Sequence, residues 1–286
     1  MKPAKFEYSR PEDLPTVLAL LAKTEDARIL AGGQSLVPMM NFRIARPQAL
    51  IDINRVPGLD YIRKDGQVIA IGALTRHADI QRSPIIKADL PIIAEAYAWV
   101  AHSAVRNRGT LCGNLCHADP ASEMPALMQL LEAEMIVVSH TNQRKVPATA
   151  FFTGTYETAL EPGEMLTEVR IRVPAVGTGW GFEEVSMRKG DFAWAACAVT
   201  LRLEGGQITA PRVAAAGVGD SSLRLSAVEA ALDGKAPLAE LFDAAAQAGA
   251  NAINPPETPT ASAEYRRDLL RALLPRVLSA AVNRAM

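Results

Sequence analysis

The sequence predicts an α+β protein of two domains, comprising residues 1–176 and 177–286. Three observations support this division. In the first part, short strand-like runs alternate with segments of helical periodicity. The stretch Val173–Gly179, with one proline and two glycines, has the composition of a linker. Beyond it, strand-like runs precede helical segments, which is typical of a separate α+β domain.

The first element expected in the N-terminal domain is a helix over residues 11–23. A proline and two acidic residues favour a helix start there, and apolar residues follow at helical spacing. Strands are expected over residues 27–30 and 49–53. The pair Asp65-Gly66, between the strand-like runs Tyr61–Lys64 and Gln67–Ile71, predicts a β-hairpin with a two-residue turn.

The next long segment, residues 85–103, has the apolar spacing of a helix. Another helix is expected to start near Ser122, followed by a strand over residues 134–139. In the C-terminal domain the pattern predicts a three-stranded antiparallel sheet over residues 180–185, 192–203 and 207–218, then helices over residues 222–233, 238–250 and 263–285. Pro275 lies inside the last helix, where proline costs about 3 kcal/mol unless the helix kinks or begins there.

Composition and charge exclude several functional classes. The formal net charge is −1, and no stripe of Lys and Arg predicts a nucleic-acid partner. No apolar run approaches the roughly 18 residues of a membrane span. The N-terminus lacks the apolar segment of a secretory signal, so a cytoplasmic location is expected. Of the three cysteines, only Cys112 and Cys116 cluster, next to His117, and these are too few for a disulfide framework, a structural zinc site or an iron–sulfur cluster.

Two glycine-rich segments carry most of the functional information. The first is Ala31-Gly32-Gly33-Gln34-Ser35-Leu36, which follows a predicted strand. It can be read as a tight strand-to-helix turn, or as a place where a ligand phosphate meets bare backbone N–H groups. The second is Gly109-Thr110-Leu111-Cys112-Gly113-Asn114, which also lies close to a probable helix start. The pair, about eighty residues apart, favours phosphate binding more than either segment alone.

Neither segment contains a lysine, and neither has the P-loop or the Rossmann glycine pattern. A diphosphate bound here would therefore rely on neutral donors, each contributing roughly 1.5–3 kcal/mol to a charged group. Glu123 is suited to accept from ribose hydroxyls, although an acid in a first helical turn is also favoured by the helix dipole. The four histidines are scattered and no Ser/His/Asp arrangement is present, so no acid–base catalytic residue is predicted.

The two segments, with Asp119-Pro120 and Glu123-Met124-Pro125 downstream, resemble the medium, FAD-binding subunit of molybdenum hydroxylases. This family includes the flavoprotein subunits of carbon monoxide dehydrogenase, quinoline oxidoreductase and nicotine dehydrogenase, and the flavin domain of xanthine dehydrogenase. The resemblance spans nearly the whole chain. It implies a two-lobed FAD-binding domain of the vanillyl-alcohol-oxidase-like type over residues 1–176, with the dinucleotide extended between the lobes. It also implies that the C-terminal domain covers the flavin.

The resemblance implies that both glycine-rich segments bind the FAD diphosphate, that His117 reaches towards the phosphates and that Glu123 binds a ribose. Val100, His102, Leu166 and Phe192 fall in segments near the flavin, although core packing also explains Val100, Leu166 and Phe192. The cofactor set is Ala31, Gly32, Gly33, Gln34, Ser35, Leu36, Val100, His102, Thr110, Leu111, Cys112, Gly113, Asn114, His117, Glu123, Leu166 and Phe192.

Two positions depart from the pattern of the family. Phe192 stands where relatives often have tyrosine, so a hydroxyl contact to the flavin is not expected. Glu183 and Glu184 stand near the place where some members have a lysine that contacts FAD. Cationic tuning of the flavin from that place is therefore not expected either.

By resemblance, the chain is the FAD-carrying, electron-transfer subunit of an oxidoreductase. A large partner subunit would hold the molybdopterin cofactor and oxidise the substrate. A small partner would carry two [2Fe–2S] clusters and pass electrons to the FAD of this chain, which then reduces an external acceptor. A dimer of heterotrimers is implied. Two alternatives stay open: a stand-alone flavin-dependent oxidase, and an assembly subunit without flavin.

Overall fold

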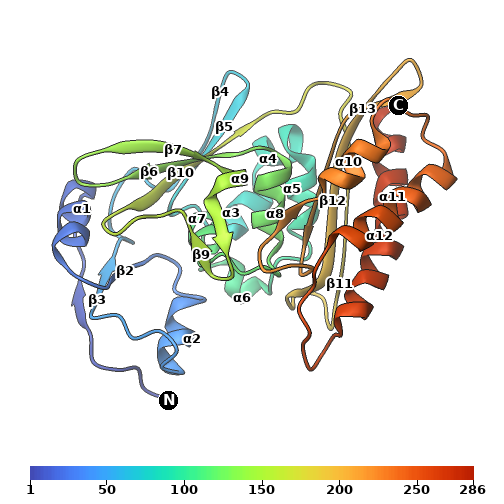
Figure 1. Ribbon diagram of the computed structural model, residues 1–286. Helices are drawn as coiled ribbons and strands as arrows, with labels where there is room; N and C mark the ends of the chain where they lie inside the picture. The colour runs from blue at the N-terminus through green and yellow to red at the C-terminus, as the bar shows by residue number, and fades with distance from the viewer.

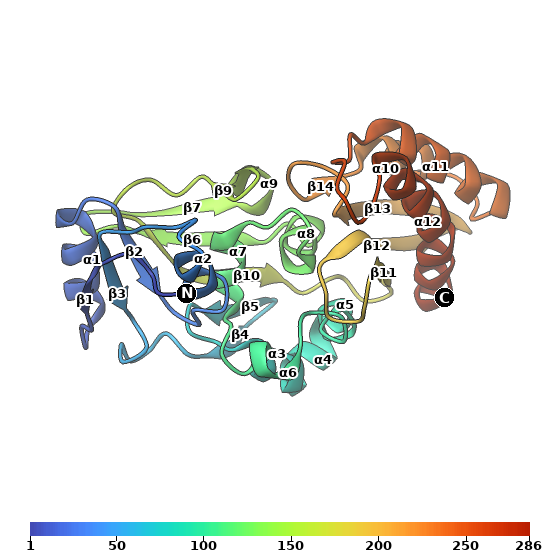
Figure 2. The same cartoon turned by 90° about the horizontal axis from the view of Figure 1, so that it is seen from below.

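The chain forms three main sheets that lie in a row, as a computed structural model that describes all of residues 1–286 shows (Figures 1 and 2). An N-terminal lobe occupies one end, a middle lobe follows, and the C-terminal part occupies the other end. The two chain termini lie in opposite end parts of this row.

The N-terminal lobe is a small parallel sheet with two helices. Its elements are β1 (Glu7–Ser9), α1 (Leu14–Lys23), β2 (Ala27–Leu30), α2 (Leu36–Asn41) and β3 (Ala49–Asp52), and its strand order is β1-β3-β2. Helix α1 begins three residues later than expected, because Asp13 is its N-cap and accepts from the Thr16 N–H at 2.7 Å. Its buried face is formed by Val17, Leu18 and Leu21.

The middle lobe is built on a five-stranded antiparallel sheet. The strands are β4 (Ile62–Asp65), β5 (Val68–Gly72), β6 (Glu134–Val138), β7 (Gln143–Pro147) and β10 (Met165–Arg172), in the order β4-β5-β10-β6-β7. The predicted hairpin is present. Its turn is Gly66-Gln67, one residue later than expected, with Gly66 at a φ of +57° that favours glycine.

The remaining elements of the middle lobe are short. They are α3 (His77–Arg82), α4 (Pro84–Asp89), α5 (Pro91–Ala96), α6 (Ser103–Arg106), α7 (Leu111–His117), α8 (Glu123–Leu130), α9 (Ala148–Phe151), β8 (Phe152–Gly154) and β9 (Glu157–Thr158). A single helix over residues 85–103 is wrong. Leu90 leaves the helical region at a ψ of 57°, since the residue before a proline is disfavoured there, and Pro91 starts a new helix.

The C-terminal part contains β11 (Gly179–Ser186), β12 (Ala193–Glu204), β13 (Gln207–Ala216), β14 (Leu223–Arg224), α10 (Ser226–Leu232), α11 (Ala239–Ala252) and α12 (Ala263–Ala285). Its sheet has four strands, so the three-stranded prediction is corrected. Leu223 and Arg224, expected in a helix, instead pair with Ala215 and Ala214 of β13 as a short edge strand. Helix α12 continues through Pro275.

The C-terminal sheet is covered on both faces, which fixes it against the middle lobe. Along β12, Ala195, Cys197 and Val199 pack on the C-terminal helices, while Ala196 and Ala198 belong to the core of the middle lobe. This alternation follows from the two-residue period of a strand. Helix α12 lies directly on the backbone of β11, because a Cβ on Gly181 would come within 2.3 Å of the Val277 carbonyl oxygen.

Candidate functional site

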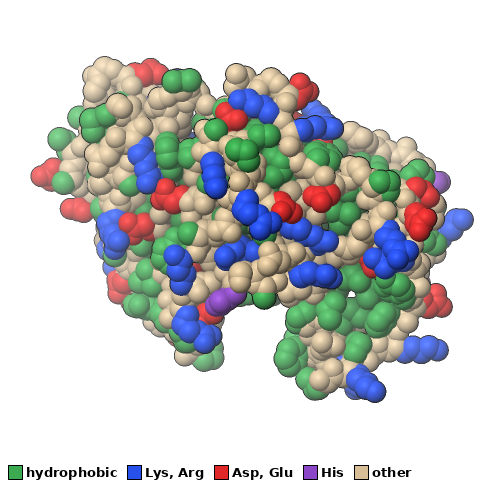
Figure 3. Space-filling view, turned by 180° about the vertical axis from the view of Figure 1, so that it is seen from behind, with side chains coloured by type: hydrophobic (Ala, Val, Ile, Leu, Met, Phe, Trp, Pro, Cys, Tyr) green, Lys and Arg blue, Asp and Glu red, His purple; other side chains and the backbone are tan.

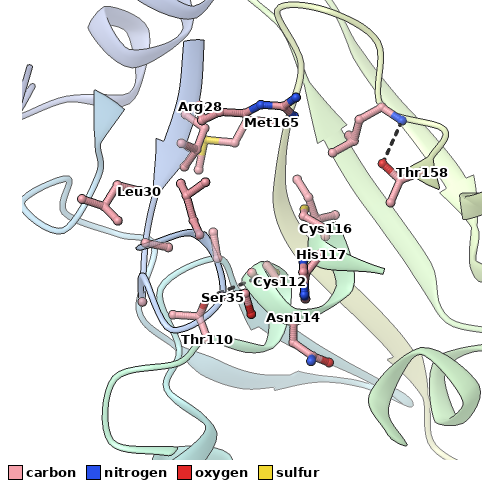
Figure 4. Close-up of a pocket in the computed structure, with 18 of the residues that line it drawn as sticks. Arg28, Leu30, Ser35, Thr110, Cys112, Asn114, Cys116, His117, Thr158 and Met165 are labelled. Atoms are coloured by element: carbon pink, nitrogen blue, oxygen red, sulfur yellow. Dashed lines mark hydrogen bonds between the residues drawn. The ribbon is translucent and has the colours of Figure 1, made fainter. Parts of the chain in front are cut away.

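A cavity of about 2000 Å³ lies between the N-terminal and middle lobes (Figure 4). Seen from behind, the surface is hollowed where these lobes meet (Figure 3). The loop Arg188–Phe192 of the C-terminal part lines it as well. Pockets for drug-sized ligands measure about 300–1,000 Å³, so this larger cavity has room for an extended ligand such as a dinucleotide.

The first glycine-rich segment forms the turn from β2 into α2 and leaves its donors free. The backbone N–H groups of Gly32, Gly33, Gln34 and Ser35 have no acceptor within the chain. Gly33 has a φ of +71°, which a residue with a side chain rarely adopts. Successive backbone N–H groups without a partner form an anion-binding concavity, so these four free donors beside a cavity indicate a site for an anionic ligand.

The second glycine-rich segment is the start of helix α7 rather than an open loop. Thr110 is the N-cap, and its hydroxyl oxygen accepts from the Gly113 N–H at 3.1 Å. A Cβ on Gly113 would lie only 2.7 Å from that oxygen. The N–H groups of Thr110 and Cys112 have no acceptor within the chain. This segment therefore adds two further donors to the cavity wall.

The two segments touch through their backbones. A Cβ on Gly32 would lie 2.4 Å from the Arg108 carbonyl oxygen and 2.7 Å from the Gly109 Cα. Only glycine fits at position 32 without displacing this backbone. Segments far apart in the sequence thus form one continuous donor surface, and Ser35, Thr110, Cys112 and Asn114 gather there in Figure 4.

Every residue of the cofactor set named above lines this cavity except Leu111. The Leu111 side chain is buried in the core. Val100 and Leu166 are buried and also border the cavity, so they combine core packing with a place in its wall. Phe192 is 55% exposed at the cavity edge and is not a core residue.

The histidines near the cavity differ in their surroundings. The His117 ring lies 5.0 Å from the ring of Tyr156, whose hydroxyl donates to Asp119 at 3.1 Å. Burial lowers the pKa of His117, which favours its neutral form. His102 is exposed at the start of α6. His77 is buried with its Nδ1 atom 3.1 Å from the Tyr97 hydroxyl, and burial lowers its pKa to about 4.

Two buried acids, Glu123 and Glu184, lie where the middle lobe meets the C-terminal sheet. Each is 4% exposed, and neither carboxyl oxygen of Glu184 has a hydrogen-bond partner. Burial raises the pKa of both acids, and the charge of Glu123 raises that of Glu184 further. Glu123 borders the cavity and Glu184 does not. The neighbouring Glu183 points away and forms an ion pair with Arg276 at 2.8 Å.

Sequence reasoning missed several residues that line the cavity, including Arg28, Arg144, Tyr156 and Met165. In Figure 4 the Arg28 side chain extends from β2 at one end of the cavity, beside Met165. The position of Arg28 on the strand leading into the first glycine-rich segment was the available signal. The other three come from β7, the β8–β9 turn and β10, which only the folded arrangement brings to the cavity.

No group of three or more His, Cys, Asp or Glu side chains lies close enough together to hold a metal ion. None of the helices combines the length and the apolar character that crossing a bilayer requires.

Comparison with known protein families gives two matches along the chain. Residues 4–175 match the family model described as the FAD binding domain in molybdopterin dehydrogenase. Residues 180–281 match the model described as the CO dehydrogenase flavoprotein C-terminal domain.

Individual relatives match over the full length. The chain is 42% identical to subunit alpha of the 6-hydroxypseudooxynicotine dehydrogenase complex of Paenarthrobacter nicotinovorans, covering 100% of this chain and 97% of the relative. It is 41% identical to the carbon monoxide dehydrogenase medium chain of Hydrogenophaga pseudoflava, covering 98% of each.

Solved structures match equally well. A chain of carbon monoxide dehydrogenase from Hydrogenophaga pseudoflava superposes with a TM-score of 0.97 at 43% identity, with 99% of both chains covered. A chain of quinoline 2-oxidoreductase from Pseudomonas putida 86 gives 0.95 at 37% identity, with 100% of both chains covered.

Proposed function

Because this chain belongs to the family of FAD-binding medium subunits of molybdenum-containing hydroxylases and dehydrogenases, we propose that it is the electron-transfer flavoprotein of such a complex. The observation that carries this proposal is the run of free N–H donors from Gly32 to Ser35 beside the large cavity. A dinucleotide diphosphate has the charge and the acceptor oxygens that these donors require.

The residues present fit a noncovalently bound FAD. The N–H groups of the first segment, with those of Thr110 and Cys112, would hold the diphosphate without a lysine in either segment. Glu123 would bind a ribose hydroxyl, and Leu166 and Phe192 would contact the ring system. When bound, the flavin would supply hydride and one-electron chemistry, while the chain orients it and excludes water.

The proposal extends to partners. Electrons would arrive from two [2Fe–2S] clusters of a small subunit, which receives them from a large molybdopterin-binding subunit, and would leave to an external acceptor. The named relatives are described as a medium chain and as a subunit of a complex, which supports this arrangement. Exposed apolar side chains, among them Phe42 and Ile44, gather on the N-terminal lobe, as expected of a surface that another protein covers (Figure 3).

The proposal also covers the domain division, the assembly and the cellular location. The first domain, residues 1–176, is of the vanillyl-alcohol-oxidase-like type, and residues 177–286 form the second domain. The complex is a dimer of heterotrimers. It works in the cytoplasm.

The proposal is tested by purifying the chain with its co-purifying subunits and measuring extractable flavin and its reduction. The expected result is a yellow complex with FAD that is released by denaturation and is reduced when the complex turns over. Gly33→Val and Gly113→Val should abolish flavin binding, because Gly33 has a positive φ and a Cβ on Gly113 would lie 2.7 Å from the Thr110 hydroxyl oxygen.

The same experiment separates the alternatives. A colourless complex without extractable flavin would contradict the proposal and favour an assembly subunit. Turnover of a small alcohol by the isolated chain would favour a stand-alone oxidase.

A further inference from the structure

Asn54 and Arg76 form a hydrogen-bonded bridge behind the two glycine-rich segments. The Asn54 Nδ2 atom donates to the carbonyl oxygens of Ala31 at 2.8 Å and of Leu30 at 3.4 Å. The Arg76 guanidinium donates through Nη2 to Asn54 Oδ1 at 2.6 Å and through Nη1 to the Arg108 carbonyl oxygen. The bridge therefore connects a carbonyl next to Gly32 with the carbonyl that precedes Gly109.

This bridge lies on the side of the segments that faces away from the large cavity. Neither Asn54 nor Arg76 lines that cavity. Asn54 and Arg108 instead border a separate cavity of about 360 Å³ on the other side of the first segment. Neither bridge residue would touch a ligand held by the free donors.

The orientation of the Asn54 amide is fixed by its partners. Asp52 accepts from the Asn54 backbone N–H at 2.9 Å and from its Nδ2 at 2.6 Å. Asp52 is buried and is itself held by Tyr8 at 2.5 Å and Arg10 at 3.4 Å. A reversed amide would direct its oxygen at a carboxylate and two carbonyls and its NH₂ at a guanidinium. Only one orientation satisfies every group.

The bridge decides where the first segment directs its donors. In a trans peptide the carbonyl of one residue and the N–H of the next point in opposite directions. Because Asn54 binds the Ala31 carbonyl from behind, the N–H of Gly32 is turned to the other side, where the cavity lies. The contact of Arg76 with the Arg108 carbonyl holds the second segment close to the first. This close approach is possible because residue 32 is a glycine.

We propose that Asn54 and Arg76 are positioning residues for the FAD diphosphate, acting by holding the two glycine-rich segments together with their N–H groups turned towards the cavity. This inference rests on the proposed function. Arg76 also places a positive charge behind two segments that contain no lysine, which favours a bound dianion.

The test uses the full-length chain with FAD removed, titrated with FAD by flavin fluorescence. Asn54→Asp keeps the shape and the acceptor for Arg76 but replaces the donor to the Ala31 carbonyl with an oxygen. Arg76→Lys keeps the charge, but one ammonium group cannot reproduce the two-pronged bridge. Each variant should lower the FAD affinity about tenfold or more. The double variant should bind FAD about as tightly as the more impaired of the two single variants. The two effects should not add, because both residues act through one bridge.

Two matched controls use positions that do not line the cavity, the exposed Asn251 and the half-buried Arg202. Asn251→Asp on α11 and Arg202→Lys on β12 should leave FAD affinity within about twofold of the parent chain. The midpoint of thermal unfolding without FAD is measured for all variants. A positioning role predicts that the bridge variants lose FAD affinity while this midpoint stays within a few degrees of the parent.

The outcomes separate the two proposals. A parent chain that binds no FAD would contradict the proposed function. A parent that binds FAD, with bridge variants that bind it equally well, would overturn this inference alone. Bridge variants that unfold without FAD would overturn it too, because the pair would then support the fold as a whole. Binding by Arg76→Lys at parental affinity would overturn the positioning role of the bridge, because the positive charge alone would then be sufficient.

Discussion

Glycine at position 32 illustrates how one missing side chain can shape a binding surface. Its Cα approaches the backbone of Arg108 and Gly109 so closely that any Cβ would overlap it. The contact brings the two donor segments together. The positive φ of Gly33 makes the sharp bend in the first segment. Absence of side chains at these positions is therefore part of the site.

Gly32→Ala should separate the two segments. The added methyl group meets backbone atoms that cannot move aside cheaply, so the free energy of unfolding should fall by about 1–3 kcal/mol and FAD occupancy should drop. Denaturant unfolding and the flavin-to-protein ratio measure both effects. Gly154→Ala is the control, because its Cβ would meet only the flexible side chain of Glu157. Equal flavin content in the two variants would contradict the close contact.

The buried acids Glu123 and Glu184 make stability depend on pH. An acid whose pKa is raised by folding binds more protons in the folded chain than in the unfolded chain, so stability falls as the pH rises. The contribution is fully present below the ordinary glutamate pKa of 4.5 and is lost as the pH rises through the raised pKa values of the pair.

Glu184→Gln should make the chain more stable at pH 8 than the parent by about 2 kcal/mol, because it removes a buried charge without a partner. The fall of stability with pH between about pH 4.5 and pH 8 should become less steep. Urea unfolding over a pH series tests this. Glu183→Gln is the matched control, since that acid forms an ion pair with Arg276 at the surface and its loss should leave the slope unchanged.

At the scale of elements, prolines and glycines decide where helices break and how closely they pack. Pro91 divides the apolar stretch after residue 84 into separate helices, whereas Pro275 stays inside an unbroken α12. The difference lies in what surrounds them. Helix α12 is buried along β11 and β12 through Leu274, Val277 and Leu278, and this packing offsets the unfavourable proline.

Pro275→Ala should stabilise the C-terminal part by about 1–2 kcal/mol. Alanine restores the helical N–H donor and relieves the clash of the proline ring with the preceding turn. Part of the gain is offset because the unfolded chain becomes more flexible. Thermal and urea unfolding measure the change. Pro237→Ala, in the loop before α11, should be neutral or slightly destabilising, and a destabilised Pro275→Ala would show that the proline supports the packing of α12.

At the scale of the whole molecule, the cavity lies where three parts of the chain meet. The N-terminal lobe supplies the first donor segment, the middle lobe supplies α7, and the loop Arg188–Phe192 closes one side. That loop is seated against the middle lobe by Lys189, 5.2 Å from the Trp99 ring centre. A ligand bound here would contact all three parts and so stabilise their arrangement.

FAD should therefore raise the stability of the whole chain rather than of one lobe. At a free FAD concentration of 100 times its dissociation constant, the expected gain is about 2.7 kcal/mol. Thermal unfolding with and without FAD measures it, and hydrogen exchange should show protection in both glycine-rich segments. Riboflavin, which lacks the diphosphate, is the control and should give little protection. Protection confined to one segment would contradict a ligand held by both.

Most elements could be predicted from the sequence because they depend on local periodicity, caps and turn residues. The α1 helix, the β4–β5 hairpin and the long strands β11 to β13 follow from such patterns. The two glycine-rich segments identified the family, since their composition and spacing are local properties of the chain. The pairing of β14 with β13 could not be predicted, because β14 has only two residues and carries almost no periodic signal of its own.

What the sequence by itself determined is the order of elements and the residue types available for binding a diphosphate without lysine. Only the tertiary structure decided that Gly32 meets Gly109, that Asn54 and Arg76 bridge the two segments from behind, and that Glu184 lies buried near Glu123. The physical reason is that hydrogen bonds, close packing and the repulsion of buried charges depend on distances in space. Residues far apart in the chain acquire those distances only on folding.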